Sequence, residues 1–172
     1  MSVPVVEPLG PSTLAKKWRI DILTVPSPDG GTTPDVWTRL RGVTALTIND
    51  EVTSETTSDY DGDGWASSQN TSRSWGLEPT VRRATDPDAP AQYDAGQEFL
   101  RLNAATLGCD TSSVVVRYYE INCETGPQVQ AYQGSTSVAY KEQAGAPADL
   151  STAVITLSGQ GPRADITHPL AV

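Results

Sequence analysis

Hydrophobic and polar residues alternate over several stretches of the chain, and this period predicts β-strands. Residues 18–22 alternate apolar with charged side chains, as a half-buried strand does. Residues 36–48 are rich in β-branched side chains and predict a second strand, in which Gly42 marks a bulge. Residues 73–81 alternate again and predict a third strand.

The C-terminal half of the chain predicts further strands. Residues 114–121 are the densest run of β-forming side chains, with apolar residues on both faces. Residues 129–140 are polar and small, and residues 154–157 predict the last strand. The sequence therefore predicts a mainly β domain, a sandwich or barrel-like fold, over residues 16–172, preceded by a Pro-rich extended arm over residues 1–15.

One α-helix is predicted over residues 94–107. Asp94 is a suitable N-cap, and Gln97 lies at the position of its capping-box partner. Apolar side chains then recur at helical spacing. This single helix is expected to flank the sheet.

The segment from Asn49 to Asn70 predicts a long acidic loop or a flexible hairpin. It is rich in Thr, Ser and Asp, and no Lys or Arg occurs between Arg41 and Arg73, where six acidic residues fall. The six are Asp50, Glu51, Glu55, Asp59, Asp61 and Asp63. Long loops inside compact domains are usually functional or disordered, so this segment is a candidate interaction site.

The charge of the whole chain narrows the classes of partner. The 172 residues include 12 Lys and Arg against 21 Asp and Glu, which gives a net charge of -9. Phosphates would be repelled rather than neutralised, which argues against a protein that clamps nucleic acid or binds an anionic membrane. The chain has neither a membrane-spanning apolar run nor a secretory signal at its start, so we expect it on the cytoplasmic side.

Metal binding is a second possible function of the acidic segment. Asp59, Asp61, Asp63 and Gly64 match the first half of an EF-hand calcium loop. The twelfth position of that motif is Asn70, where a bidentate Glu is required, and the flanks predict no helices. A solvated acidic loop is the simpler interpretation, and we expect no cofactor.

No catalytic site is apparent. The only histidine is His168, which is followed by Pro169 close to the C-terminus and is expected at the surface or at an interface. There is no His cluster for a catalytic zinc and no GxxxxGK[ST] phosphate loop. We expect a protein that is not an enzyme.

The four tryptophans separate into core and surface candidates. Trp18 and Trp75 fall at alternating strand positions and are expected in the core. Trp37 begins a strand and is expected at an edge of the sheet. Trp65 ends the acidic segment, where it either folds back on the domain or contacts a partner.

Four stretches of the chain, in order and at matching spacing, resemble the major tail tube protein of long, non-contractile-tailed bacteriophages that infect actinobacteria. They are residues 35–43 (DVWTRLRGV), 58–65 (SDYDGDGW), 115–120 (VVRYYE) with 131–134 (AYQG), and 157–163 (LSGQGPR).

The resemblance implies a β-sandwich flanked by one helix, six copies closing into a ring, and rings stacking into a hollow tube for genome ejection. Its partners would be further copies of the chain, a tape-measure protein, and tail tip and terminator proteins. DNA would pass through the lumen without specific binding. The protein would reside in the virion tail after assembly in the host cytoplasm. An immunoglobulin-like surface domain, which some relatives carry, is not expected.

The resemblance also implies which segments make contacts. The acidic segment would reach a neighbouring subunit or ring, and the arm 1–15 is a second stacking element. The interface residues would be Asp50, Glu51, Glu55, Asp59, Tyr60, Asp61, Asp63 and Trp65. The polar strand has little to bury and is a candidate wall of the lumen. Its candidate residues are Gln130, Tyr132, Gln133, Ser135 and Ser137.

Three alternatives stay open from the sequence. One is a calcium-stabilised β-sandwich binding module, adhesin-like or lectin-like, that uses Asp59, Asp61 and Asp63. Another is a glycan-cleaving β-domain with a carboxylate pair, although no pair stands out. The third is the tube protein of a secretion or contractile injection machine, which shares the same fold.

Overall fold

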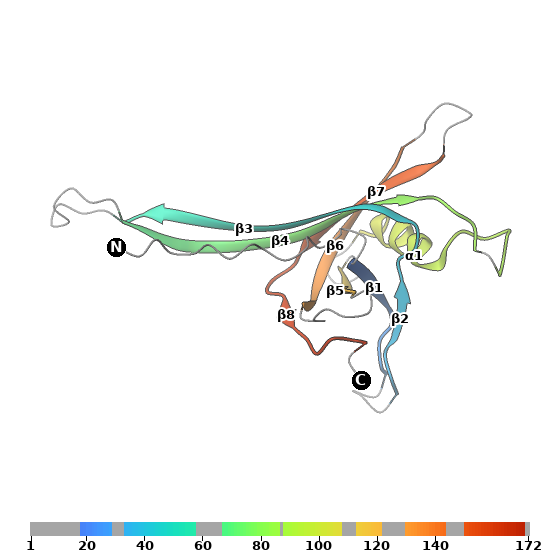
Figure 1. Cartoon of the computed structure of the whole chain (residues 1–172), viewed down its shortest axis with the longest axis horizontal. Coiled ribbons are helices and arrows are strands. Elements are labelled where there is room, and N and C mark those ends of the chain that lie inside the picture. The colour runs from blue at the N-terminus through green and yellow to red at the C-terminus, as the bar shows by residue number, and fades with distance from the viewer. Residues whose placement is uncertain are drawn as a thin grey trace, which may run out of the picture.

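The computed structural model describes residues 18–28, 33–57, 67–86, 88–107, 113–121, 130–143 and 150–170. The elements in these ranges are β1 (Trp18–Val25), β2 (Val36–Arg39), β3 (Val43–Thr56), β4 (Ser68–Arg82), α1 (Ala95–Ala104), β5 (Ser113–Glu120), β6 (Ala131–Gln143), β7 (Thr152–Gly159) and β8 (Ala164–Asp165). The strands form one antiparallel sheet in the order β2-β1-β5-β6-β7-β4-β3, with β8 paired to β6 (Figure 1). The predicted mainly β fold with one flanking helix is confirmed, with these strands joined in one sheet rather than two.

One face of the sheet forms the hydrophobic core. Ile20 lies opposite Tyr118, and Leu77 lies opposite Leu157, so these side chains share a face. All four are 2% exposed or less. Leu100 of α1 belongs to the same buried cluster, so the helix covers this face. Full burial of each such side chain is worth about 1.5–3 kcal/mol, and this packing holds the sheet and the helix together.

The opposite face of the sheet is polar over its middle strands. Ser137 of β6 lies opposite Ser158 of β7, and Ser158 lies opposite Gly76 of β4. The neighbouring residues on this face are Gln133, Ser135, Thr156 and Glu78. The two faces therefore differ sharply in chemistry: one is apolar and covered by α1, and the other is lined by small polar side chains.

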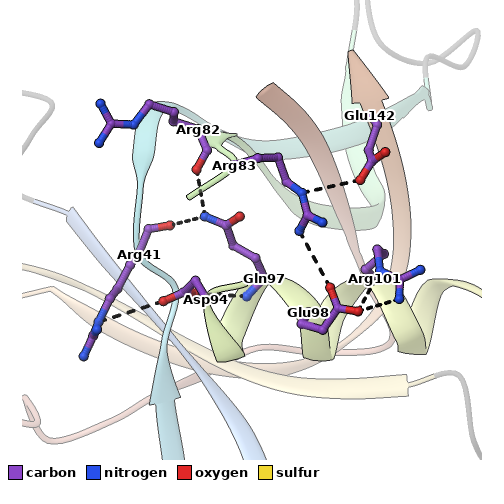
Figure 2. A network of polar contacts seen from close by, with 8 residues as sticks. All are labelled: Arg41, Arg82, Arg83, Asp94, Gln97, Glu98, Arg101 and Glu142. Carbon is purple, nitrogen blue, oxygen red and sulfur yellow. Dashed lines mark hydrogen bonds and ion pairs between the residues drawn. The ribbon is translucent and has the colours of Figure 1, made fainter. Parts of the chain in front are cut away.

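The helix is tied to the sheet by a buried glutamine. The carboxylate of Asp94 accepts a hydrogen bond from the backbone N–H of Gln97 at 3.2 Å, so the predicted N-cap is confirmed. The Gln97 side chain does not complete a capping box. Its Nε2 donates to the backbone carbonyls of Arg41 at 2.9 Å and Arg82 at 3.0 Å (Figure 2). Gln97 thus fixes α1 to the start of β3 and the end of β4.

Arg83 extends this network across the helix (Figure 2). Its side chain is 6% exposed and lies 3.8 Å from the Glu98 carboxylate and 3.4 Å from that of Glu142. Its guanidinium group also stacks 3.9 Å from the centre of the Tyr93 ring. Arg101 hydrogen-bonds to Glu98, which lowers the pKa of that carboxyl. The network joins α1 to the far end of β6.

Residues 36–48 form two strands rather than the single bulged strand predicted. Gly42 adopts a φ of +75°, and a Cβ atom there would lie 2.8 Å from the carbonyl oxygen of Arg82. Both the left-handed conformation and the close backbone approach require glycine. The chain therefore turns at this point, between β2 and β3.

Of the two structures predicted for residues 49–70, a long acidic loop or a flexible hairpin, the described residues form a long β-hairpin. β3 and β4 pair from Val43 opposite Val81 out to Thr56 opposite Ser68. β4 pairs with β7 only from Gly76 onward, so the outer part of the hairpin projects beyond the sheet (Figure 1). Backbone pairing of β-branched Thr and Val forms these strands without the apolar alternation that the prediction relied on.

Candidate assembly interface

The projecting hairpin has no hydrophobic face of its own. Every residue over 49–57 and 67–74 is exposed, and Val52 leaves 50% of its surface in contact with solvent. β3 lies at the end of the strand order, so its outer edge carries backbone groups that no described strand pairs. A long exposed edge strand is a template for pairing with another chain. The hairpin is therefore the candidate site of assembly.

Trp75 holds the base of the hairpin against the sheet. Its ring lies directly over Gly134 and Gly159, and a Cβ atom at Gly159 would lie 2.4 Å from the indole. Its Nε1 donates to the carbonyl of Gly161 at 2.8 Å, and its ring stacks on Tyr118 with centres 6.2 Å apart. Glycine inside a strand permits such a close approach.

An ionic network lies beside Trp75 at the base of the hairpin. Arg73 donates to the two carboxylate oxygens of Asp50 at 3.0 and 2.8 Å, and Arg163 donates to one of them at 2.7 Å. Arg163 also donates to the Tyr118 hydroxyl at 2.9 Å and lies 4.4 Å from the centre of the Tyr132 ring. The hydrogen bond from Arg73 and the charge of Arg163 hold the pKa of Asp50 below its usual value, against partial desolvation. Burial raises the pKa of Tyr118.

Trp75, Asp50, Arg73 and Arg163 together form the hairpin anchor. They come from β3, β4 and the segment before β8, and they border a cleft of about 740 Å³ beneath the hairpin. Because charge-assisted bonds and a buried indole converge where β4 leaves β7, the anchor fixes the direction in which the hairpin projects.

The predicted interface residues fall in three places. Asp50 belongs to the hairpin anchor. Glu51 and Glu55 are exposed on β3, and within the described ranges neither carboxylate has an ion pair or a hydrogen bond. The remaining interface candidates lie outside the described residues. They are Asp59, Tyr60, Asp61, Asp63 and Trp65.

The alternative of a calcium site at Asp59, Asp61 and Asp63 concerns residues outside the described ranges, and so does the predicted arm over residues 1–15. Within the seven described ranges, no group of three His, Cys, Asp or Glu side chains is placed to hold a metal ion.

The predicted lumen residues do not share one surface. Tyr132 lies on the core face, with its ring centre 5.2 Å from that of Tyr118. Gln133, Ser135 and Ser137 lie on the polar face, and Gln130 is exposed just before β6. Alternation along the strand separates the set, as it must in a pleated sheet.

The prediction that His168 lies at the surface is wrong, because the residue is buried with 7% of its surface exposed. Its Nε2 lies 2.7 Å from the Glu120 carbonyl, and its Nδ1 accepts a hydrogen bond from the backbone N–H of Leu170 at 3.1 Å. The ring meets the edge of Tyr119 at 5.1 Å. The segment after β8 returns over the end of β5, which covers the imidazole. The hydrogen bonds assign the proton to Nε2, and the residue has a structural role.

Sequence patterns missed the contacts of Arg163 and of Gln97, which was predicted only as a capping-box partner, because the residues that they contact are distant in the chain. Arg163 is 113 residues from Asp50, and Gln97 is 56 residues from Arg41. Gly134 and Gly159 are a sequence signal for the base of the hairpin, because glycine within a strand often marks the close approach of another group. That signal does not reveal which side chain approaches.

Comparison with known proteins gives similarity at the level of structure. No family model matches the chain, and no curated protein matches it. A chain in the tail of an empty gene transfer agent particle, refined with helical and C6 symmetry, superposes with a TM-score of 0.58 at 13% sequence identity. That superposition covers 91% of this chain and 100% of the other. The two chains share a fold.

A chain in the virion of a native gene transfer agent particle gives a similar result. Its TM-score is 0.56 at 11% identity, again over 91% of this chain and 100% of that chain. At these identities the similarity establishes the fold and no more. Within the described ranges, no helix has the length and apolar character needed to cross a membrane.

Proposed function

We propose that this protein is a structural subunit of a phage-like tail, of the major tail tube type. The observation that carries the proposal is the long hairpin, exposed at every described residue of its outer part, on a fold shared with a chain of a C6-symmetric tail. A monomer gains little from such a hairpin, whereas a repeating assembly can pair and cover it.

Ring formation follows from the free edges of the sheet. β2 and β3 end the strand order, and β3 is 14 residues long. When an edge of one copy meets a different edge of the next, the contact is heterologous and repeats until the ring closes. The C6 symmetry of the similar tail supports six copies per ring. Rings then stack into a tube, with the hairpin and the arm 1–15 as the stacking elements.

The polar face is assigned to the lumen, and the face covered by α1 to the outside. Gln133, Ser135 and Ser137 fit this assignment, whereas Tyr132 and its aromatic contacts belong to the core. Over the middle strands this face carries mainly small polar side chains. Its cations there include Arg117, which is bound to Asp21, and Lys141 near the end of β6, so a passing phosphate backbone meets little free positive charge. A tape-measure protein occupies the lumen before ejection, and tip and terminator proteins close the two ends of the tube.

The similarity to a chain of a gene transfer agent tail supports a phage-like tail protein, and we extend the proposal to the long, non-contractile type on the sequence resemblance alone. The protein accordingly resides in the virion tail and assembles in the host cytoplasm. Nothing in the described residues favours the calcium-dependent binding module or a glycan-cleaving enzyme.

Negative-stain electron microscopy of the purified protein over a concentration series tests the proposal. Rings or hollow filaments of uniform width with sixfold symmetry are expected. A protein that stays monomeric at every concentration, including with added tip proteins as initiators, would contradict it.

A further inference from the structure

Unpaired positive charge gathers around a groove at the β1 end of the sheet. The groove has a volume of about 370 Å³ and runs between the start of β1 and the start of β3. Arg19, Arg39 and Arg41 are three of its lining residues. The chain has only 12 Lys and Arg residues, so three arginines around one groove make it a candidate binding surface for an acidic partner.

The chain itself neutralises little of this charge. Arg39 is exposed, and its side chain has no ion pair or hydrogen bond with the described part of the chain. The Nε of Arg19 is buried without a hydrogen-bond partner. The side chain of Arg41 is 58% exposed, with its Nε 4.0 Å from the Asp94 carboxylate.

Asp21 is an acidic residue on the same face as Arg39, because the two are register partners. Its carboxylate is already engaged by Arg117, at 3.0 Å from Nε, and by the hydroxyl of Tyr119, also at 3.0 Å. Within the described ranges, the guanidinium groups of Arg19 and Arg39 therefore have no ion pair.

The hairpin carries the opposite charge. Glu51 and Glu55 are exposed and unpaired within the described ranges, and the hairpin's described arginine, Arg73, is bound to Asp50. These glutamates cannot reach the groove of their own chain. β3 starts at the groove and runs away from it, so Glu55 lies about 30 Å beyond Leu46 at roughly 3.3 Å per residue.

Two stretches of strand in the groove pair on one side only within the described ranges. Trp18 and Arg19 pair with β5 on one side, while residues 43–46 pair with β4 on one side. The walls of the groove therefore offer free strand edges as well as guanidinium groups, which suits an extended strand with acidic side chains.

We propose that this arginine groove receives the β3–β4 hairpin of a second copy, with Glu51 and Glu55 meeting Arg19, Arg39 and Arg41. The inference rests on the proposed function and adds the surface on which the hairpin docks. Because groove and hairpin are different surfaces, the contact is heterologous and propagates from copy to copy. The net charge of -9 favours this occupant over nucleic acid.

Charge reversal tests the pairing. The variants Arg39→Glu/Arg41→Glu and Glu51→Arg/Glu55→Arg are each expected to raise the concentration needed for assembly by at least about tenfold. The fourfold swap, with all of these substitutions in one chain, is expected to assemble again. An equimolar mixture of the two double variants is expected to co-assemble, because each supplies the charge that the other needs. Light scattering and electron microscopy provide the readout.

Two matched controls reverse exposed charges elsewhere. Lys141→Glu and Asp88→Lys are expected to assemble like the wild-type protein. Circular dichroism and the melting temperature establish folding. If the Arg→Glu pair unfolds, Arg39→Gln/Arg41→Gln removes the charge without reversing it and is expected to weaken assembly in the same direction.

The outcomes separate the inference from the proposed function. Wild-type tubes together with folded reversal variants that assemble normally would overturn the inference alone, as would failure of both the fourfold swap and the mixture. A wild-type protein that forms neither rings nor tubes would contradict the proposed function itself. Short duplex DNA that binds the wild-type protein but not Arg39→Glu/Arg41→Glu, with assembly unchanged, would assign the groove to nucleic acid instead.

Discussion

The body of the sheet and the projecting hairpin are built from the same ladder of backbone hydrogen bonds but are stabilised differently. In the body, Leu77, Leu100 and Leu157 are 1% exposed or less. All three belong to one buried hydrophobic cluster, to which both the strands and the helix contribute. Over the outer hairpin every described residue is exposed. The body therefore draws its stability from burial within the chain. The surface of the hairpin contributes little to folding, which leaves it free to serve contacts with another molecule.

The largest difference between the two regions is expected when one apolar side chain is truncated in each. Leu157→Ala in the body is expected to cost about 2–5 kcal/mol of unfolding free energy, because it leaves a cavity in a packed core. Val52→Ala on the hairpin is expected to cost under about 0.5 kcal/mol, because the side chain is half exposed. Urea unfolding of both variants measures the difference in unfolding free energy. Equal losses in the two variants would contradict the conclusion that the body and the hairpin are stabilised differently.

A smaller effect is expected from polar groups. Gln97→Leu removes both hydrogen bonds to the carbonyls of Arg41 and Arg82 and leaves two part-buried acceptors without these donors. A loss of about 1–3 kcal/mol is expected. Gln69→Leu, at an exposed position of the hairpin, is the control and is expected to change little. If Gln97→Leu were neutral in thermal unfolding, the tie between α1 and the two strands would not contribute to stability.

The smallest effect concerns the hairpin anchor and depends on pH. The pKa of Asp50 is lowered in the folded protein from its ordinary value of 3.8, so its contribution to stability is fully present above that value. The contribution is lost as the pH falls through the lower, folded-state pKa. The melting temperature of the wild-type protein is therefore expected to exceed that of Asp50→Asn at neutral pH, with the difference shrinking below about pH 4.

Glu55→Gln is the control for this titration, since it removes an exposed carboxylate of the same hairpin that has no partner in the described ranges. No comparable loss of stability is expected from it at neutral pH. An Asp50→Asn variant that also matched the wild-type protein at neutral pH would show that the anchor does not stabilise the fold.

Local patterns predicted the elements that bury a face of their own. The alternation over residues 18–22 gave β1, and the Asp94 cap gave the start of α1, since burial and capping both act over a few residues. The split at Gly42 was missed because the crowding that demands glycine comes from Arg82, 40 positions along the chain. His168 was misplaced for the same reason: the strand end that covers it is set by tertiary packing.

The hairpin is the region in which sequence periodicity predicted least. Its strands are polar on both faces, so periodicity could not separate them from a loop, although their charge marked them as a site. The hairpin anchor could not be predicted, because Asp50, Arg73 and Arg163 meet only once the register of three segments is set.

Shortening the hairpin tests the central claim most directly. Residues 53–72 are replaced by a two-residue Asn-Gly turn, which keeps Asp50, Arg73 and Trp75 in place. A folded protein with a melting temperature close to that of the wild-type protein is expected, and no tubes are expected by electron microscopy. Tubes of wild-type width formed by the shortened protein would contradict the claim that the hairpin serves assembly.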